Sequence, residues 1–393
     1  MRRKNLRERY SALIAIAAGA ALLLIPSITA DPAFGAPRRH HAPPSSPDGK
    51  GERPGRNDDR PGHFSIVADN LNNPRQITID GGSVYVAEAG LGGPCDPSAP
   101  DQPCIGFTSS VTRVRGRDVE RVQSGLISVF VPGEGDVVGV DAVTRANGQL
   151  LGVATGACAP FPLPIAAQAG KVLRLEGGTS FTAIGDVSSV ECTLNPDGFE
   201  IDSDPYGIAA RGDTVYVADA AGNDIIGVRN GQAFLVTLIP STNGLPIGAD
   251  NQPVPTSLAF GPDGALYIGT LAFAAGNGGA KIYRLDLSDN SLTEYARGLT
   301  AVTAIAFDRR GRLYASEFTT DLTTFSPDGA IAMIPNGGHT PRRLIGTGLL
   351  HYPGGVATMG GNLFVSNWSI APGTDGQFGP GNHGQLLRFN GDD

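Results

Sequence analysis

Residues 204–223 read DPYGIAARGDTVYVADAAGN. The stretch opens with an Asp-Pro pair and continues with a short apolar run, a Gly-containing turn and a second run rich in Val and Tyr that ends in small and polar residues. Two apolar runs of strand length on either side of a tight turn predict a β-hairpin.

The same unit recurs five more times along the chain, beginning at Asn73, Val138, Val254, Ala301 and Tyr352. Equivalent positions in the second run are Tyr85, Leu151, Tyr216, Tyr267, Tyr314 and Phe364. Their spacings are 66, 65, 51, 47 and 50 residues. Propeller blades span roughly 40 to 50 residues, so the two longer spacings predict loop insertions early in the chain.

Most hairpins are followed by a third apolar segment, such as AKIYRLD from Ala280, and several by a fourth, such as SLTEYARG from Ser291. Four short strands repeated six times predict an all-β, six-bladed propeller, and the hairpin units resemble those of NHL and TolB-like propellers. The chain ends on a third strand at residues 385–390, and HFSIVADNL at residues 63–71 reads as a fourth strand. We expect this N-terminal strand to complete the last blade and close the ring.

Composition agrees with this fold, since Gly and Pro supply 55 and 30 of the 393 residues and hydrophobic residues 40%. Residues 1–63 carry a net charge of +5, with 11 Lys and Arg against 6 Asp and Glu, and the remainder carries −13. An acidic body repels phosphate backbones, so we expect no nucleic-acid partner.

The N-terminus predicts export. Five basic residues within residues 1–9 precede an apolar stretch of 14 residues at 12–25, which is typical of a signal peptide and shorter than the ~20 residues of a membrane span. We interpret residues 1–36 as a signal peptide, 37–63 as a disordered Pro-rich linker and 64–393 as the propeller. The mature chain is expected to be secreted, monomeric and without a transmembrane span.

Four cysteines in an exported chain indicate two disulfides, with three possible connectivities. We favour Cys95 with Cys104 and Cys158 with Cys192. All four lie in segments that a propeller brings to one face, where the loops joining strands two and three meet the connections between blades. This loop face also receives the other long loops and is where we expect function.

Several segments resemble known families. Residues 204–223 and 254–269 resemble NHL repeats. RVQSGLISV, NPDGFEIDSDPYGI, GGAKIYRLD, YARGLTAVTAIAF and HYPGGVATMGGNLFVSNWSIAPG resemble the ScyD/ScyE family of exported propeller proteins. The resemblance runs from about Phe64 to Phe389 and implies fold and export, but no chemistry.

One repeat position carries polar side chains. Three residues after the strand-two aromatic, the six copies hold Glu88, Ala154, Asp219, Thr270, Glu317 and Asn367. If these positions surround the mouth of the central funnel, their oxygens are suited to a hard cation or a substrate water, and Ca²⁺ is the one cofactor we consider. The alternative is structural, with each side chain accepting a hydrogen bond from a neighbouring backbone N–H group.

The starts of the innermost strands hold Arg75, Tyr206, Thr256, Thr303 and Gly354. Gluconolactonase-like propellers, a remoter resemblance, bind their metal with carboxylate and Asn side chains from such positions, and this chain lacks that set. Arg75 and Tyr206 are instead candidates for ligand binding. Trp368 either stacks on a ligand or packs beneath a loop.

An acidic connection contains Glu191, Asp197, Glu200, Asp202 and Asp204. Its spacing does not match an EF-hand calcium loop, so we interpret it as solvated. The sequence contains no G-x-S-x-G, H-E-x-x-H or P-loop motif. We therefore expect an exported scaffold that recognises a small ligand or protein partner on its loop face. The alternative is a metal-assisted, lactonase-like hydrolase or lyase that uses Glu88, Asp219, Glu317 and Asn367.

Overall fold

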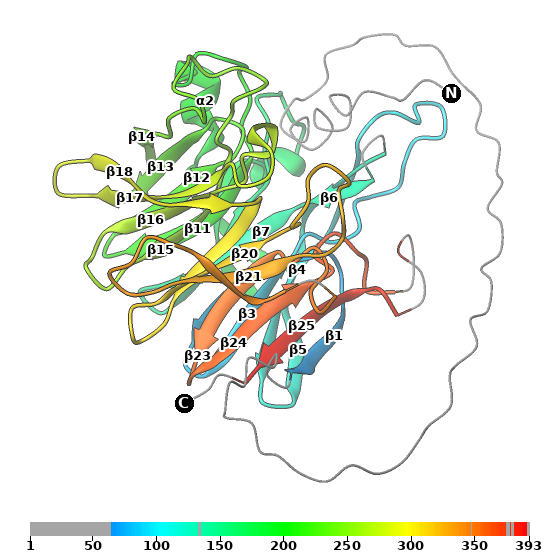
Figure 1. The fold of residues 1–393 in the computed structure, drawn as a ribbon. Coiled ribbons are helices and arrows are strands. Elements are labelled where there is room, and N and C mark those ends of the chain that lie inside the picture. The colour runs from blue at the N-terminus through cyan, green and yellow to red at the C-terminus, as the bar shows by residue number, and fades with distance from the viewer. Residues whose placement is uncertain (1–63, 133–134, 347, 375–377, 379–380, 391–393) are drawn as a thin grey trace, which may run out of the picture. The chain divides into compact units, whose positions relative to one another are not determined.

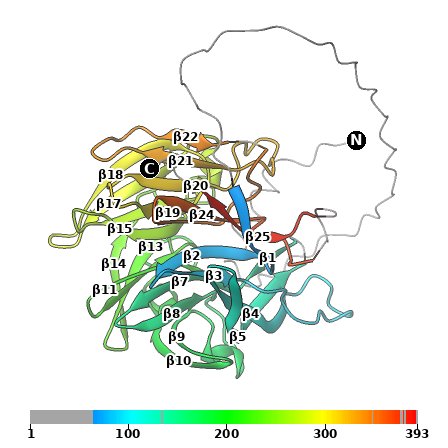
Figure 2. The same cartoon turned by 90° about the horizontal axis from the view of Figure 1, so that it is seen from below.

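The computed structural model describes residues 64–390, apart from 133–134, 347, 375–377 and 379–380. The predicted signal peptide and linker, residues 1–36 and 37–63, lie outside the described residues. Within the described part, the strands form six antiparallel sheets arranged around a central axis (Figures 1 and 2). The all-β six-bladed propeller expected from the repeats is confirmed.

Each of the first three blades runs outward from the axis in chain order. Blade one contains β2 (Pro74–Asp80), β3 (Ser83–Glu88), β4 (Cys104–Arg115), β5 (Asp118–Val131) and an added edge strand, β6 (Asp136–Val138). Blade two contains β7 (Val140–Ala146), β8 (Gln149–Ala154), β9 (Lys171–Gly177) and β10 (Ser180–Asp186). Blade three contains β11 (Pro205–Arg211), β12 (Thr214–Asp219), β13 (Asp224–Arg229) and β14 (Gln232–Leu238).

The last three blades repeat this arrangement, and the first and last described strands pair in the sixth. Blade four contains β15 (Pro255–Phe260), β16 (Leu266–Thr270), β17 (Ala280–Asp286) and β18 (Ser291–Leu299). Blade five contains β19 (Val302–Phe307), β20 (Leu313–Glu317), β21 (Ala330–Ile334) and β22 (Arg342–Ile345). Blade six contains β23 (Gly355–Met359), β24 (Asn362–Asn367), β25 (Gly384–Phe389) and β1 (Phe64–Leu71).

Ring closure follows the expected route. Strand β1 pairs antiparallel with β25, with Phe64 opposite Phe389 and Ala68 opposite Leu386, and the blue and red strands lie side by side in Figure 2. The first strand of the described chain thus supplies the outermost strand of the last blade.

The apolar core is divided among the six blade interfaces. The second strands are buried on both faces, as in β3 and β20, because each sheet packs between two neighbours. For example, Tyr85 and Leu126 of blade one pack against Val140 and Leu150 of blade two in one apolar cluster. Outer strands such as β14 are largely exposed or half-buried.

Both predicted disulfides are present, Cys95 with Cys104 and Cys158 with Cys192. The first closes the loop between β3 and β4. The second ties the loop after β8 to α2 (Ser188–Leu194), a short helix in the connection to blade three that the sequence analysis did not predict. Among the described residues, the structure contains no apolar helix of the length that a membrane span requires.

Candidate functional site

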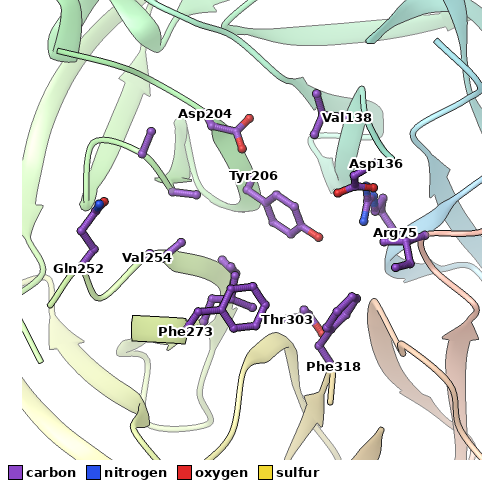
Figure 3. A pocket seen from close by; sticks show the side chains of 15 residues that line it. Arg75, Asp136, Val138, Asp204, Tyr206, Gln252, Val254, Phe273, Thr303 and Phe318 are labelled. Carbon is purple, nitrogen blue, oxygen red and sulfur yellow. The ribbon is translucent and has the colours of Figure 1, made fainter. Parts of the chain in front are cut away.

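A pocket opens on the loop face, over the ends of the innermost strands (Figure 3). It holds about 690 Å³ of space not filled by atoms, part of it open to solvent. Blades one, three, four, five and six and the connections between blades contribute to its wall. The lining residues are Arg75, Asp136, Val138, Asp204, Tyr206, Ala220, Ala221, Gln252, Val254, Thr256, Leu271, Phe273, Thr303, Phe318 and Ile370.

Two repeat positions supply much of this wall. The second residue of an innermost strand lines it in four blades, as Arg75, Tyr206, Thr256 and Thr303. The residue directly after strand two lines it in three blades, as Ala220, Leu271 and Phe318. Both positions lie at the hairpin ends nearest the axis, so the repeat itself assembles the pocket.

The side chain of Gln76 lies across the central channel of the propeller and separates this pocket from the opposite end of that channel. Its Nε2 donates to the carbonyl oxygens of Thr256 at 2.5 Å and Thr303 at 3.1 Å. Gln76 belongs to blade one, whereas its acceptors belong to blades four and five on the far side of the ring. It lines a second pocket, formed by the middle of the innermost strands. The side chain therefore bridges the axis beneath Thr256 and Thr303.

Close backbone packing also narrows the channel. A Cβ on Gly207 of β11 would lie 2.5 Å from the carbonyl oxygen of Thr256. Only glycine permits β11 and β15 to approach this closely. Blades five and six are linked near the axis by the Thr303 hydroxyl, which donates to the carbonyl oxygen of Pro353 at 2.8 Å.

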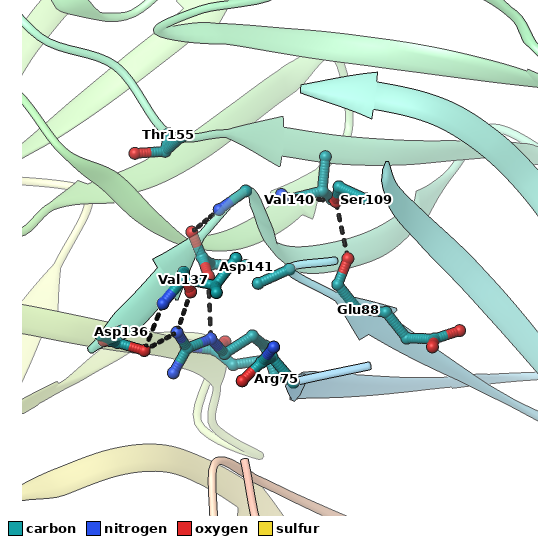
Figure 4. Close-up of polar contacts among 12 residues, drawn as sticks. Arg75, Glu88, Ser109, Asp136, Val137, Val140, Asp141 and Thr155 are labelled. Atoms are coloured by element: carbon teal, nitrogen blue, oxygen red, sulfur yellow. Dashed lines mark hydrogen bonds and ion pairs between the residues drawn. The ribbon is translucent and has the colours of Figure 1, made fainter. Parts of the chain in front are cut away.

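Arg75 is the buried cation of the pocket, with 4% of its surface exposed. Its Nη2 lies 3.1 Å from Oδ1 of Asp136 and its Nε lies 3.2 Å from Oδ1 of Asp141, and Nη2 also donates to the carbonyl oxygen of Val137 (Figure 4). Burial works to lower the pKa of Arg75, but Asp136 and neighbouring groups outweigh it and the pKa rises. The guanidinium thus stays charged and is already paired with two carboxylates.

At Asp141 the effect of burial on the pKa outweighs the effect of the Arg75 charge. Burial raises its pKa to about 6, although the charge of Arg75 acts in the opposite direction. Arg75 shares its charge between two carboxylates, so it does not offset the full desolvation of Asp141.

Burial also favours the protonated form of two further groups in the pocket. Burial raises the pKa of Asp204 well above its usual range, with Asp141 adding to the effect. Burial likewise raises the pKa of Tyr206. A protonated carboxyl group and a phenol are both hydrogen-bond donors, and Figure 3 shows the Tyr206 ring extending into the pocket.

The opposite wall is aromatic. Phe273 and Phe318 lie with their ring centroids 6.3 Å apart and belong to an apolar cluster with Tyr352 and Trp368. Figure 3 shows both phenylalanine rings across the pocket from Asp204. The pocket therefore combines one polar wall with one apolar wall.

Of the eight residues predicted to bind a ligand, Arg75 and Tyr206 line this pocket. Four others accept a hydrogen bond from the backbone N–H just before strand one of their own blade. These bonds join Asn72 to Glu88 at 2.7 Å, Asp204 to Asp219 at 2.7 Å, Thr300 to Glu317 at 2.8 Å and His351 to Asn367 at 2.7 Å. They are the contacts expected of turn acceptors, the alternative interpretation of this repeat position.

The two glutamates have additional partners away from the axis. Arg121 pairs with Glu88 at 2.8 Å and Arg343 pairs with Glu317 at 2.8 Å, both from outer strands. Figure 4 shows the Glu88 side chain directed away from the Arg75 cluster. The structure does not bring the residues of the hydrolase hypothesis together in the pocket.

The two remaining predicted residues are engaged near the pocket. The Thr270 hydroxyl donates to the carbonyl oxygen of Lys281 at 3.1 Å. Trp368 stacks on His351, with ring centroids 4.5 Å apart and planes inclined by 22°, and is 8% exposed. Trp368 therefore packs under the loop-face segments, as the second of its two interpretations expected.

Sequence reasoning missed Asp136, Gln252, Phe273 and Phe318. For Phe318 a signal was present, because it follows Glu317 by one residue and strand-end residues alternate in direction. Asp136 lies in the added edge strand β6 and Gln252 in the connection between blades three and four, where the repeat gives no register, so no comparable signal marked them.

The acidic connection is solvated only in part, since Glu200 is exposed and Asp197 half-buried. Glu191, Asp202 and Asp204 are 0%, 6% and 6% exposed, because the Cys158–Cys192 disulfide and α2 fold the connection over blade three. In the part of the chain that the structure describes, no three Asp, Glu, His or Cys side chains are gathered closely enough to hold a metal ion by themselves.

Comparisons with known proteins assign no activity to this chain. No protein-family model matches the sequence, and no curated protein matches it. Similar solved structures include a streptogramin B lyase, 15% identical with a TM-score of 0.45 over 85% of this chain and 88% of that one. A calcium-binding protein, regucalcin, from Agrobacterium tumefaciens is 11% identical, with a TM-score of 0.48 over 84% and 94%. A chain of the nidogen/laminin complex is 15% identical, with a TM-score of 0.42 over 68% and 86%. These likenesses show the fold alone.

Proposed function

We propose that this chain is an exported binding protein whose funnel pocket takes an uncharged small molecule with an aromatic part. The observation that carries the proposal is the opposition of two walls, Phe273 and Phe318 on one side and Tyr206 and Asp204 on the other. An aromatic ligand buries its ring on the first wall while an oxygen acceptor receives hydrogen bonds from the second.

The charges of the pocket support a neutral ligand. Arg75 is paired with Asp136 and Asp141, so it offers no unpaired cation to an anionic group. An incoming carboxylate would also meet Asp136, which lines the pocket, and no new ion pair would offset the cost of removing it from water.

Export is supported by the basic and apolar segments of residues 1–36 and by the two disulfides, which persist in oxidising compartments. The resemblance to the ScyD/ScyE family between Phe64 and Phe389 belongs to the same proposal, as does the expectation of a monomer.

A matched pair of probes tests the pocket. We expect neutral aromatic ketones such as 2-acetylnaphthalene to bind the purified protein in calorimetry, and 2-naphthoate, which has the same ring system with a carboxylate, to bind at least tenfold more weakly. Tyr206→Phe should weaken binding of the ketone about fivefold, because one hydrogen bond contributes about 1 kcal/mol.

Tyr216→Phe is the control, since Tyr216 packs on Phe260 outside the pocket. Equal affinity for ketone and carboxylate would contradict the proposal. So would a Tyr206→Phe variant that binds the ketone as tightly as the unchanged protein, or a panel of neutral aromatic ketones and amides without a single saturable ligand.

A further inference from the structure

Asp219, Asp224 and Glu191 lie behind the pocket, where α2 covers the β12–β13 hairpin. Asp219 and Asp224 lie directly opposite each other at the end of this hairpin. Oε2 of Glu191 on α2 and Cγ of Asp219 lie 3.2 and 3.3 Å from the position that a Cβ would take on Gly222. Glycine at this turn therefore makes room for the glutamate against the hairpin.

Two of the three carboxylates have no partner within the described residues. Glu191 and Asp224 are each 0% exposed, and none of their four carboxylate oxygens accepts a hydrogen bond. Asp219 differs, because it accepts hydrogen bonds from the hydroxyl of Ser203 and the backbone N–H groups of Asp204 and Gly222.

The neighbours of these two groups are acidic. The charged groups that act on Glu191 and Asp224 are all carboxylates, namely Asp197, Asp202 and Asp219, together with Glu191 itself acting on Asp224. An isolated buried carboxylate is costly, and like charges opposite each other on neighbouring strands repel. Such groups must bind either protons or a cation.

We propose that Glu191 and Asp224 bind a calcium ion between α2 and the β12–β13 hairpin. Their four unpartnered oxygens supply hard ligands, and the only sulfur of α2, that of Cys192, is held in a disulfide. Two carboxylates are not a complete coordination shell. Ca²⁺ accepts six to eight oxygens in flexible geometry and takes the rest from backbone carbonyls and water. Mg²⁺ is disfavoured because it keeps a rigid octahedral shell and gives up its water reluctantly.

The position gives the ion a structural role. It would join α2, which the disulfide holds to the loop of blade two, to the hairpin whose Ala220 and Ala221 line the funnel pocket. The site is separate from the pocket itself, so its test does not depend on the proposed ligand.

Calcium titration of the full chain, first treated with a chelator, tests the proposal by calorimetry and by thermal unfolding. We expect one Ca²⁺ per chain and a rise in melting temperature. Glu191→Gln and Asp224→Asn should each lower the affinity at least tenfold. Glu200→Gln, in the same connection but exposed, should change it less than twofold, and Mg²⁺ at equal concentration should bind at least tenfold more weakly.

Both amide variants remove a buried charge, so without calcium they should melt at or above the temperature of the unchanged protein. Hydrogen exchange on the unchanged protein provides a test without any variant, since calcium should slow exchange at residues 188–194 and 219–224. The proposal is overturned if calcium does not bind, as expected if both carboxyl groups are simply protonated. It is also overturned if both variants retain the affinity, or if exchange in these two segments does not respond.

Discussion

At the residue scale, Gln76 links blades that are far apart in the sequence. Its amide group reaches from blade one to backbone carbonyls of blades four and five, and the side chain is 8% exposed. The ring thus contains a polar strut across its axis in addition to the contacts between neighbouring blades. Leaving buried acceptors without a donor costs about 1–3 kcal/mol.

Gln76→Leu should therefore lower the free energy of unfolding by about 2 kcal/mol, since leucine cannot donate to Thr256 and Thr303. Denaturant titration followed by fluorescence measures this loss. Gln232→Leu on the exposed start of β14 is the matched control and should change stability by less than about 0.5 kcal/mol. Equal effects of the two substitutions would show that the strut is not needed.

The free energy of unfolding should also depend on pH through the titration of Asp141. Its pKa is raised to about 6 from 3.8, so the folded chain holds this proton more tightly than the unfolded chain. The group stabilises the fold below about pH 4, and this contribution is lost as the pH rises to about 6.

We expect the stability difference between the unchanged protein and Asp141→Asn to fall by about 2 kcal/mol between pH 4 and pH 6, which is the part of the linkage, at about 1.36 kcal/mol per pKa unit, that this window covers. Denaturant titrations at half-unit pH steps measure it. The exposed Asp213→Asn is the control. A difference that rises, or stays constant, across this window would contradict the prediction.

At the element scale, the end of each strand-two hairpin decides what faces the pocket. The side chains of Glu88 and Glu317 turn back to the N–H groups before strand one, while the residue after Glu317, Phe318, faces the axis. The repeat predicted the hairpins and their ends. The repeat did not predict the direction of the last side chain of strand two. That direction depends on which unpaired backbone N–H group before strand one lies within hydrogen-bonding distance.

The two disulfides hold elements of different lengths and should differ in effect. Loop-closure entropy gives about 4 kcal/mol for Cys158–Cys192, which are 34 residues apart, and about 2.5 kcal/mol for Cys95–Cys104, which are 9 apart. We expect the double Ser variant of Cys158 and Cys192 to lose more stability in guanidinium titrations than that of Cys95 and Cys104. The reverse order would show that loop length does not govern the effect.

At the scale of the whole molecule, β1 holds the ring closed. It covers the edge of β25, and Ala68 and Leu71 pack with Val84 and Phe364 in the apolar cluster between blades six and one. Without β1 this edge would present unpaired backbone groups to other chains.

Deleting residues 1–71 should therefore convert a monomer into aggregating material, whereas deleting residues 1–63 should not. Size-exclusion chromatography with light scattering distinguishes the two. Adding the 64–71 peptide to the shorter chain during refolding should restore part of the monomer. A chain that begins at residue 72 and remains monomeric, with unchanged unfolding, would contradict this role of β1.

The sequence predicted the blades and the closing strand because each depends on local pattern. It predicted the disulfide partners because the repeat places all four cysteines in segments that meet at the loop face. The proximity of Glu191 and Asp224 is a feature that the sequence did not predict. They are 33 residues apart in the sequence, and α2 brings them together over a hairpin whose turn contains Gly222. Burial of this kind depends on how a connection folds across the sheet, which no repeat encodes.

The pairing of Phe64 with Phe389 has a practical consequence. Strands β1 and β25 respectively begin and end at the rim opposite the funnel pocket, since Leu71 and Gly384 mark their other ends. A fusion partner or surface attachment joined at Phe64 or Phe389 would leave the mouth of the pocket turned toward the medium. The protein can be immobilised through either end of its propeller without blocking access to the cavity.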